Sequence, residues 1–222
     1  MLPIGDDNSA RRSTPFVTYI LILLNIAVFL YELANGALMY ENSALLNAFA
    51  AHGDEIRHGQ ALYTLVTSTF LHAGWAHLLG NMLYLWIFGD NVEDALGHWL
   101  YLGFYLLGGI VAGLVSTYVS GVSHVPNLGA SGAIAAVLGV YLVLFPGRRV
   151  RVVGFIGVIG IGYIPAIVVI AFWAILQLVN GLGVIGATSG GVGYWAHVGG
   201  FLFGVAVGLM ARGTARRQAR MA

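Results

Sequence analysis

Long runs of apolar residues, separated by short polar segments, dominate the pattern of the chain. A helix that crosses a bilayer needs about 20 mostly apolar residues, and somewhat fewer where it ends in a cavity. Six runs meet this requirement, namely residues 16–33, 75–88, 99–119, 130–145, 165–179 and 195–210. The pattern therefore predicts an all-α, polytopic membrane protein, built as a bundle of six transmembrane helices.

One further apolar segment, residues 152–163, does not fit this pattern. Glycines recur in it, at positions 154, 157, 160 and 162, and they make it a poor helix former. We expect it to lie at the membrane interface rather than to span the bilayer.

The composition agrees with a membrane protein and narrows the chemistry. Apolar residues make up 59% of the 222 positions and charged residues only 9%, and the mean hydropathy is +0.84. The net charge of +1 is too small to suggest a nucleic-acid partner, so the expected surroundings are the lipid bilayer. There is no cysteine, which excludes disulfides, a thiolate nucleophile and a cysteine-ligated metal.

The arginines predict how the bundle is oriented, because short loops rich in Lys and Arg stay on the cytoplasmic side. With six crossings, three arginine clusters fall on one side: Arg11 and Arg12; Arg148, Arg149 and Arg151; Arg212, Arg216, Arg217 and Arg220. Both termini are therefore expected in the cytoplasm.

This orientation divides the chain into three parts. We expect a cytoplasmic N-terminal segment at residues 1–15, a six-helix membrane domain at residues 16–212 and a basic cytoplasmic tail at residues 213–222. The polar start lacks the features of a signal peptide, so the first run is interpreted as a retained span. Short tails without lysine favour a prokaryotic plasma (inner) membrane.

Unusual polar residues begin three of the predicted spans. In this topology the second, fourth and sixth spans all run from outside to inside, so their first turns lie near the outer surface. His77 and Asn81 share one face of the second span, Ser131 begins the fourth, and His197 lies at the start of the sixth. These side chains are therefore predicted at similar depth, facing a bundle interior or a wet cavity.

A serine alone in a membrane helix is usually a small packing residue, and it becomes a nucleophile only beside a base. Histidine is the usual base, because it takes and returns a proton near neutral pH. Small residues recur every fourth position on both helices: Gly200, Gly204 and Gly208 on the sixth, and Gly132 with Ala136 and Ala135 with Gly139 on the fourth. Such faces let two helices approach closely enough for Ser131 to meet His197.

The acidic residues do not supply a third member of a triad. None follows residue 94, and Asp90, Glu93 and Asp94 fall at the cytoplasmic end of the bundle. We therefore expect a Ser-His dyad in which packing or a backbone carbonyl orients the histidine. The nucleophile elbow of soluble hydrolases is excluded, since Ala133 replaces its second glycine.

Acyl transfer also needs donors for a developing oxyanion. The candidates are the backbone N–H of Ser131, at a helix N-terminus, and the side chains of His77 and Asn81. Asn81 taken singly is more typical of a hydrogen bond between helices.

Three motifs together resemble the rhomboid family of intramembrane serine proteases. They are GASG at residues 129–132, AHVGGFLFG at 196–204 and HAGWAHLLGN at 72–81, in an order that covers nearly the whole chain. The resemblance implies that Ser131 is the nucleophile and His197 the base. It also implies that His77 and Asn81, with Gly129 of the nucleophile motif, form the oxyanion and binding site.

The same resemblance implies the reaction and its partners. We expect an endopeptidase that cleaves single-span membrane proteins near the outer membrane face and needs no cofactor or metal. The glycine-rich loop at residues 181–194 is interpreted either as a cap over the site, gating substrate with the fifth helix, or as a plain connector.

The chain departs from the family pattern in two places. Tyr63 and Thr64 stand where a Trp-Arg pair is frequent, and Ala135 stands where some members have an aromatic residue that stacks on the base. The anchoring of the first loop and the support of the His197 ring are therefore open.

Other function classes were weighed against this one. A metalloprotease is disfavoured because no H-E-x-x-H is present, and an aspartyl protease because only Asp90 lies near a span. A transporter would be expected to show repeated halves or midplane charges. The main alternative is a catalytically silent rhomboid-like protein that binds membrane helices.

Overall fold

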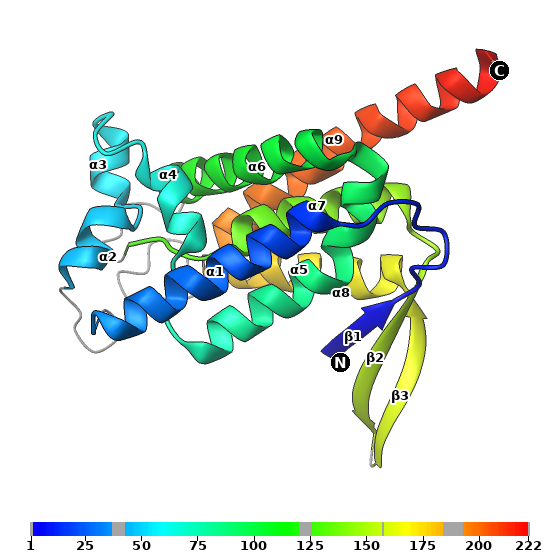
Figure 1. The fold of residues 1–222 in the computed structure, drawn as a ribbon, viewed down its shortest axis with the longest axis horizontal. Coiled ribbons are helices and arrows are strands. Elements are labelled where there is room, and N and C mark those ends of the chain that lie inside the picture. The colour runs from blue at the N-terminus through cyan, green and yellow to red at the C-terminus, as the bar shows by residue number, and fades with distance from the viewer. Residues whose placement is uncertain (1, 37–42, 120–125, 157, 184–192, 222) are drawn as a thin grey trace.

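The computed structural model describes residues 2–36, 43–119, 126–156, 158–183 and 193–221 as a bundle of helices with a small sheet at one end (Figure 1). The long helices are α1 (Phe16–Ala34), α5 (Trp75–Leu96), α6 (His98–Val119), α7 (Ser131–Leu144), α8 (Ala166–Gly183) and α9 (Tyr194–Met221). The first loop contains α2 (Ala44–Phe49), α3 (Gly53–Arg57), α4 (Thr64–Thr67) and the 3₁₀ helix η1 (Ser68–Phe70). Each predicted span thus coincides with a helix.

Four helices in the described part of the chain are long and apolar enough to cross a membrane. They are α1, α6, α8 and the first part of α9, Tyr194–Gly213. The protein is therefore a multi-pass membrane protein with a helical bundle.

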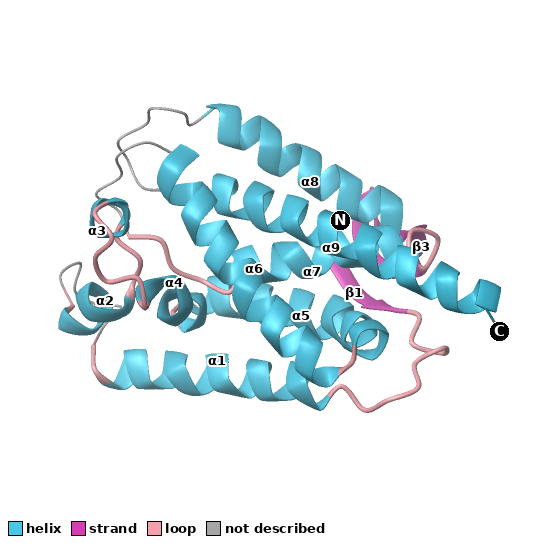
Figure 2. Ribbon diagram, turned by 90° about the horizontal axis from the view of Figure 1, so that it is seen from above, coloured by secondary structure: helices cyan, strands magenta, loops and turns pink. Residues whose placement is uncertain are grey.

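α7 is the central helix of the bundle. All ten residues from Gly132 to Tyr141 are buried, and the helix packs against α5, α6 and α9. Figure 2 shows it between α1 and α8, which lie on opposite sides. Fourteen residues span only about 21 Å, less than the roughly 30 Å of a bilayer core, so at least one end of α7 lies below a membrane surface.

The contact between α7 and α9 depends on glycine. A Cβ added to Gly200 or Gly204 would overlap the carbonyl oxygens of Gly132 or Ala136 on α7. A Cβ at Gly139 of α7 would overlap the backbone of α9 in turn. The small residues therefore let the two backbones touch, which is the close approach that the sequence pattern predicts.

A three-stranded antiparallel sheet corrects the all-α prediction. Its strands, in the order β1-β2-β3, are β1 (Leu2–Asp6), β2 (Arg149–Ile156) and β3 (Val158–Pro165). The glycine-rich segment 152–163 lies within the β2–β3 hairpin, in which Gly154 faces Gly160. Its many Val and Ile residues favour extended backbone, and glycine disfavours helix, so pairing of strands satisfies its backbone groups.

The first loop is held to the bundle by Arg57. Its guanidinium donates to the backbone carbonyl of Thr117 at the end of α6, with an Nε–O distance of 3.1 Å, and lies 6.0 Å from the ring of Tyr118. A cation at a helix C-terminus is stabilised by the free carbonyls there. Arg57 therefore anchors this loop in a chain that lacks the Trp-Arg pair.

Glu93 near the end of α5 caps the start of α1. Its fully buried carboxylate accepts the backbone N–H of Val17 at 3.0 Å and that of Thr18 at 2.7 Å, as well as the Thr18 hydroxyl at 2.7 Å. Pro15 precedes the helix without a side-chain cap of its own. The acid thus supplies the acceptors that the first turn of α1 requires.

Candidate active site

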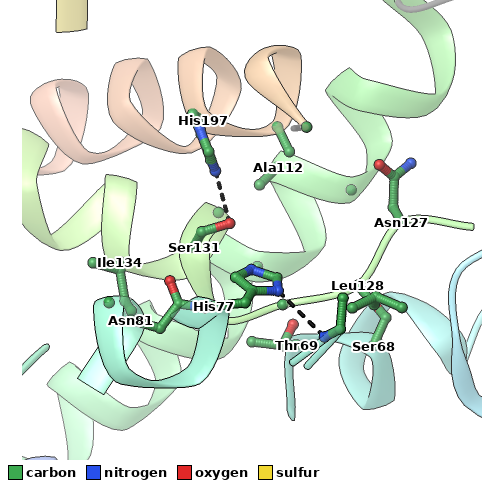
Figure 3. Close-up of a pocket in the computed structure, with 18 of the residues that line it drawn as sticks. Ser68, Thr69, His77, Asn81, Ala112, Asn127, Leu128, Ser131, Ile134 and His197 are labelled. Atoms are coloured by element: carbon green, nitrogen blue, oxygen red, sulfur yellow. Dashed lines mark hydrogen bonds between the residues drawn. The ribbon is translucent and has the colours of Figure 1, made fainter. Parts of the chain in front are cut away.

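Ser131 and His197 meet in the interior of the bundle. The Nε2 atom of His197 lies 2.7 Å from the Oγ of Ser131, across the contact between α7 and α9 (Figure 3). His197 is buried and Ser131 is partly buried. Ser131 is the first residue of α7, so its backbone N–H belongs to the turn that has no acceptor within the helix.

The pair opens into a cavity of about 690 Å³. The two residues singled out on α5, His77 and Asn81, line the same cavity, as does Gly129. The fold thus brings together side chains from α5, α7 and α9 that the sequence places up to 120 positions apart (His77 to His197). Ser68, Thr69 and Asn127 add further polar groups to its wall, and their presence was not predicted.

Gly129 lies directly against the ring of His77. Its φ is +120°, and a Cβ at this position would come within 2.6 Å of the imidazole. Its backbone N–H donates to the carbonyl of Ser68 at 2.8 Å, which fixes the chain just before Ser131. Glycine is therefore required both by the backbone conformation and by the approach of His77.

The hydrogen bonds of His77 define its tautomer. The backbone N–H of Ala73 donates to Nδ1 at 3.4 Å, so the proton of the neutral ring resides on Nε2. Nε2 and Cε1 are the ring atoms close to Gly129, with 2.7 Å and 2.6 Å to the position of an added Cβ. His77 thus presents a donor toward the loop that leads into Ser131.

A chain of buried polar groups supports Asn81. Its Nδ2 lies 3.0 Å from Nε2 of His72, and the backbone N–H of His72 donates to the carboxylate of Glu32 at 3.2–3.3 Å. Burial lowers the pKa of His72 to about 4, so the ring is neutral and can accept from Asn81 at neutral pH. One N–H of the Asn81 amide remains for the cavity. Sequence reasoning missed His72 and Glu32, although a glutamate within an apolar run is itself a signal of a buried role.

The second ring nitrogen of His197 contacts a side chain that the sequence prediction did not include. Nδ1 lies 2.8 Å from Oε1 of Gln177 on α8, and the Trp173 ring centroid lies 5.8 Å from that of His197. The contact with Trp173 agrees with the expectation that packing orients His197, whereas the hydrogen-bond partner of Nδ1 is a side-chain amide and not a backbone carbonyl. A single glutamine inside the apolar run 165–179 was the available signal.

Comparisons with known proteins agree with this arrangement. The sequence profile of the Rhomboid domain matches residues 59–214, which include every residue of the site discussed above except Glu32. The chain belongs to the rhomboid family. Members of this family are membrane serine proteases that act on transmembrane substrates within the bilayer, although some members are inactive.

Individual rhomboid relatives come from bacteria and from mitochondria. The chain is 33% identical over 183 residues to rhomboid protease GluP of Bacillus subtilis, covering 82% of this chain and 34% of GluP. It is 34% identical over 149 residues to the mitochondrial presenilin-associated rhomboid-like protein A of Danio rerio, covering 64% of this chain and 35% of that protein. It is 32% identical over 149 residues to mitochondrial rhomboid protein 1 of Saccharomyces cerevisiae, covering 65% of this chain and 40% of that protein. The chain thus spans 34–40% of the length of these relatives.

Two further expectations concern the aromatic support of His197 and the loop at residues 181–194. Ala135 on α7 is fully buried, and the aromatic ring beside His197 comes instead from Trp173 on α8. Most of the loop 181–194, interpreted as a cap, lies outside the described residues; at its ends, the Trp195 indole N–H donates to the carbonyl of Gly181 at 3.1 Å. No cluster of three or more metal-ligating side chains occurs among the described residues.

Proposed function

We propose that this rhomboid is an intramembrane serine endopeptidase that cleaves transmembrane-helix substrates by a Ser131-His197 dyad. The observation that carries the proposal is the 2.7 Å contact between the serine hydroxyl and the imidazole nitrogen inside a 690 Å³ cavity. A serine hydroxyl is a weak nucleophile unless a base removes its proton, and this contact supplies the base.

The first half-reaction forms an acyl-enzyme. As Oγ of Ser131 attacks the carbonyl carbon of the scissile peptide bond, its proton passes to Nε2 of His197. The tetrahedral intermediate collapses when His197 returns that proton to the leaving amine and the C–N bond breaks. Water then attacks the ester in the same manner, with His197 again as base, and releases the carboxylate product and free Ser131.

The negative charge on the tetrahedral oxygen requires donors that are in place before the reaction. Ser131, His77 and Asn81 line the cavity, and the donors they offer are the backbone N–H of Ser131, Nε2–H of His77 and the free N–H of the Asn81 amide. In this proposal they form the oxyanion hole, and Gly129 keeps the space open beside His77.

The proposed orientation follows from charge. The sheet, the start of α1 and the C-terminal end of α9 lie at the same end of the bundle, and the first-loop helices lie at the other (Figure 1). The arginine clusters belong to the former end, so we place both termini in the cytoplasm, with six crossings and the site near the outer face. Single-span membrane proteins in a plasma membrane are the proposed substrates.

The test uses purified protein in lipid vesicles, a single-span reporter and a serine-directed fluorophosphonate probe. The native chain is expected to cleave the reporter and to become labelled, whereas Ser131→Ala and His197→Ala reduce cleavage by about 10³-fold or more with an unchanged unfolding transition. Ser9→Ala and His58→Ala, which alter exposed residues, serve as matched controls and are expected to retain full activity.

Two results would decide against the proposal. Undiminished cleavage by folded Ser131→Ala would refute the assignment of the nucleophile. A native chain that binds the reporter but neither cleaves it nor reacts with the probe would favour the catalytically silent helix-binding alternative.

A further inference from the structure

α8 carries one amide that reaches the proposed base. The helix has a mean hydropathy of 2.1 over its candidate span, yet Gln177 interrupts it and directs Oε1 to within 2.8 Å of Nδ1 of His197. Burying an amide in an apolar environment costs free energy unless the amide is hydrogen-bonded. The hydrogen bond to His197 therefore explains how a glutamine is tolerated at this position.

The contact determines which nitrogen of His197 carries the proton. Oε1 of an amide can only accept, so Nδ1 must donate and the proton of the neutral ring resides there. Nε2 then has a free lone pair directed at Oγ of Ser131, 2.7 Å away. This is the tautomer that can accept the serine proton directly, whereas the other tautomer presents an N–H to the hydroxyl and must first move its proton to Nδ1.

A neutral acceptor suits this place in the membrane. After His197 takes the serine proton, its Nδ1–H becomes a charge-assisted donor to Gln177, so the contact strengthens as the reaction proceeds. A carboxylate would stabilise the imidazolium further, but its desolvation in the bundle would be expensive. Of the acids in the described chain, Glu32 accepts from His72 and Glu93 from the start of α1, away from Nδ1 of His197.

Trp173, which lies on α8 like Gln177, also restrains the ring of His197. Its indole is tilted by 39° to the imidazole of His197 and also lies against Phe201, one turn further along α9. Position 135 on α7 contributes only a methyl group, so the ring and its hydrogen bond are held from α8. Trp173 and Gln177 are four positions apart on α8 and therefore share one helix face.

We propose that Gln177 is a positioning residue of the active site, which fixes His197 in the Nδ1–H tautomer through its side-chain oxygen and so completes a Ser-His-Gln arrangement. The role in catalysis rests on the proposed function, whereas the tautomer can be measured without it.

The kinetic test compares two variants at one position of α8 with a control nearby. Gln177→Met keeps the length of the side chain but removes the acceptor, and it is expected to lower kcat about tenfold with little change in KM, because one neutral hydrogen bond is lost. The rate of fluorophosphonate labelling should fall in proportion. Gln177→Glu restores an acceptor and should recover most of kcat. Asn180→Ala removes an exposed amide from the same helix and should leave kcat unchanged.

The pH profile of Gln177→Glu separates positioning from packing. The titratable side chains among the described residues that line the cavity are His77, Tyr84 and His197, and Gln177→Glu adds a carboxylate next to His197. A carboxylate favours the protonated imidazole, which cannot act as base, so the acid limb of kcat/KM should move to higher pH. An unmoved acid limb, or activity no better than that of Gln177→Met, would contradict the contact.

A spectroscopic test does not depend on activity. In protein labelled with ¹⁵N-histidine, the His197 signals, identified by their loss in His197→Ala, should report the Nδ1–H tautomer in the native chain and a changed tautomer ratio in Gln177→Met. An Nε2–H tautomer in a native chain that cleaves the reporter overturns the inference and leaves the proposed function intact. The Nδ1–H tautomer in a chain that never cleaves supports the contact and removes the proposed function instead.

Discussion

The two ends of α5 carry polar residues in similar numbers but use them differently. At its start, His77 and Asn81 line the cavity, and each has one fixed hydrogen-bond partner, Ala73 and His72 respectively, and one N–H that remains available. At its end, Asn91 donates to Asp6 and Asn8 and accepts from Arg148, while Asp90 pairs with Arg11 at 2.8 Å. The first group keeps hydrogen-bonding capacity for a ligand, and the second uses it to hold the fold.

The contrast follows from what each end of the helix meets. The C-terminal end meets the N-terminal segment and the sheet, which bring backbone N–H groups and arginines to the carboxylates. Asp94, for example, accepts the backbone N–H of Ser13 at 2.8 Å and its hydroxyl at 2.6 Å. The N-terminal end meets the cavity instead. A buried polar group with spare capacity is therefore a better indication of a site than a buried polar group as such.

The largest effect on stability is expected from Glu93→Ala. The substitution removes the acceptor of two backbone N–H groups and the Thr18 hydroxyl, and the partner of His98 at 2.6 Å. Loss of a fully buried, multiply bonded charge should cost about 3–5 kcal/mol of unfolding free energy. Unfolding by detergent titration measures the change.

Glu55→Ala is the control for that experiment, because Glu55 is exposed on α3. Its unfolding curve should coincide with that of the native chain. An equally stable Glu93→Ala would show that Glu93 does not act as a structural cap of α1.

A matched pair of asparagines, ten positions apart on α5, sharpens the comparison. Asn81→Ala should lower kcat about 10²-fold or more, the loss expected when an oxyanion donor is removed, and should cost less stability than Asn91→Ala because only His72 loses a partner. Asn91→Ala should instead lower the unfolding free energy by about 1–3 kcal/mol, because it leaves buried partners unsatisfied. Its kcat per folded molecule should be that of the native chain. The test measures kcat and the unfolding free energy of both variants. A loss of kcat in Asn91→Ala, with the larger loss of stability in Asn81→Ala, would contradict the comparison.

The smallest effect is expected at Asp6. Burial raises the pKa of this carboxyl to about 6; its Oδ2 accepts from Tyr141 and Asn91, while Oδ1 lacks a partner among the described residues. Since the folded state holds the proton more tightly than an unfolded chain with a pKa near 3.8, stability should fall as the pH rises from about 4 to 6. Asp6→Asn should flatten this slope and raise the unfolding temperature at pH 7 by about 2–4 °C. If Asp6→Asn lost stability with rising pH as steeply as the native chain, the pH dependence would belong to another group.

Much of the architecture was predictable because the bilayer restricts the choices. Apolar runs of the required length had to become helices, and glycines at four-residue spacing had to lie where helices touch, as Gly200 and Gly204 do. The segment at residues 152–163 was harder, because β2 pairs both with β3 in the same hairpin and with β1, which lies some 150 residues earlier in the chain.

The sequence by itself determined a helical membrane protein of the rhomboid family and singled out Ser131, His197, His77 and Asn81, because apolar length, motif order and intramembrane polar residues are local properties. The tertiary structure alone decided which neighbours those side chains have. The contact of Gln177 with His197, and that of His72 with Asn81, join side chains whose partners depend on how helices rotate and approach, and that geometry is set by packing of the whole bundle.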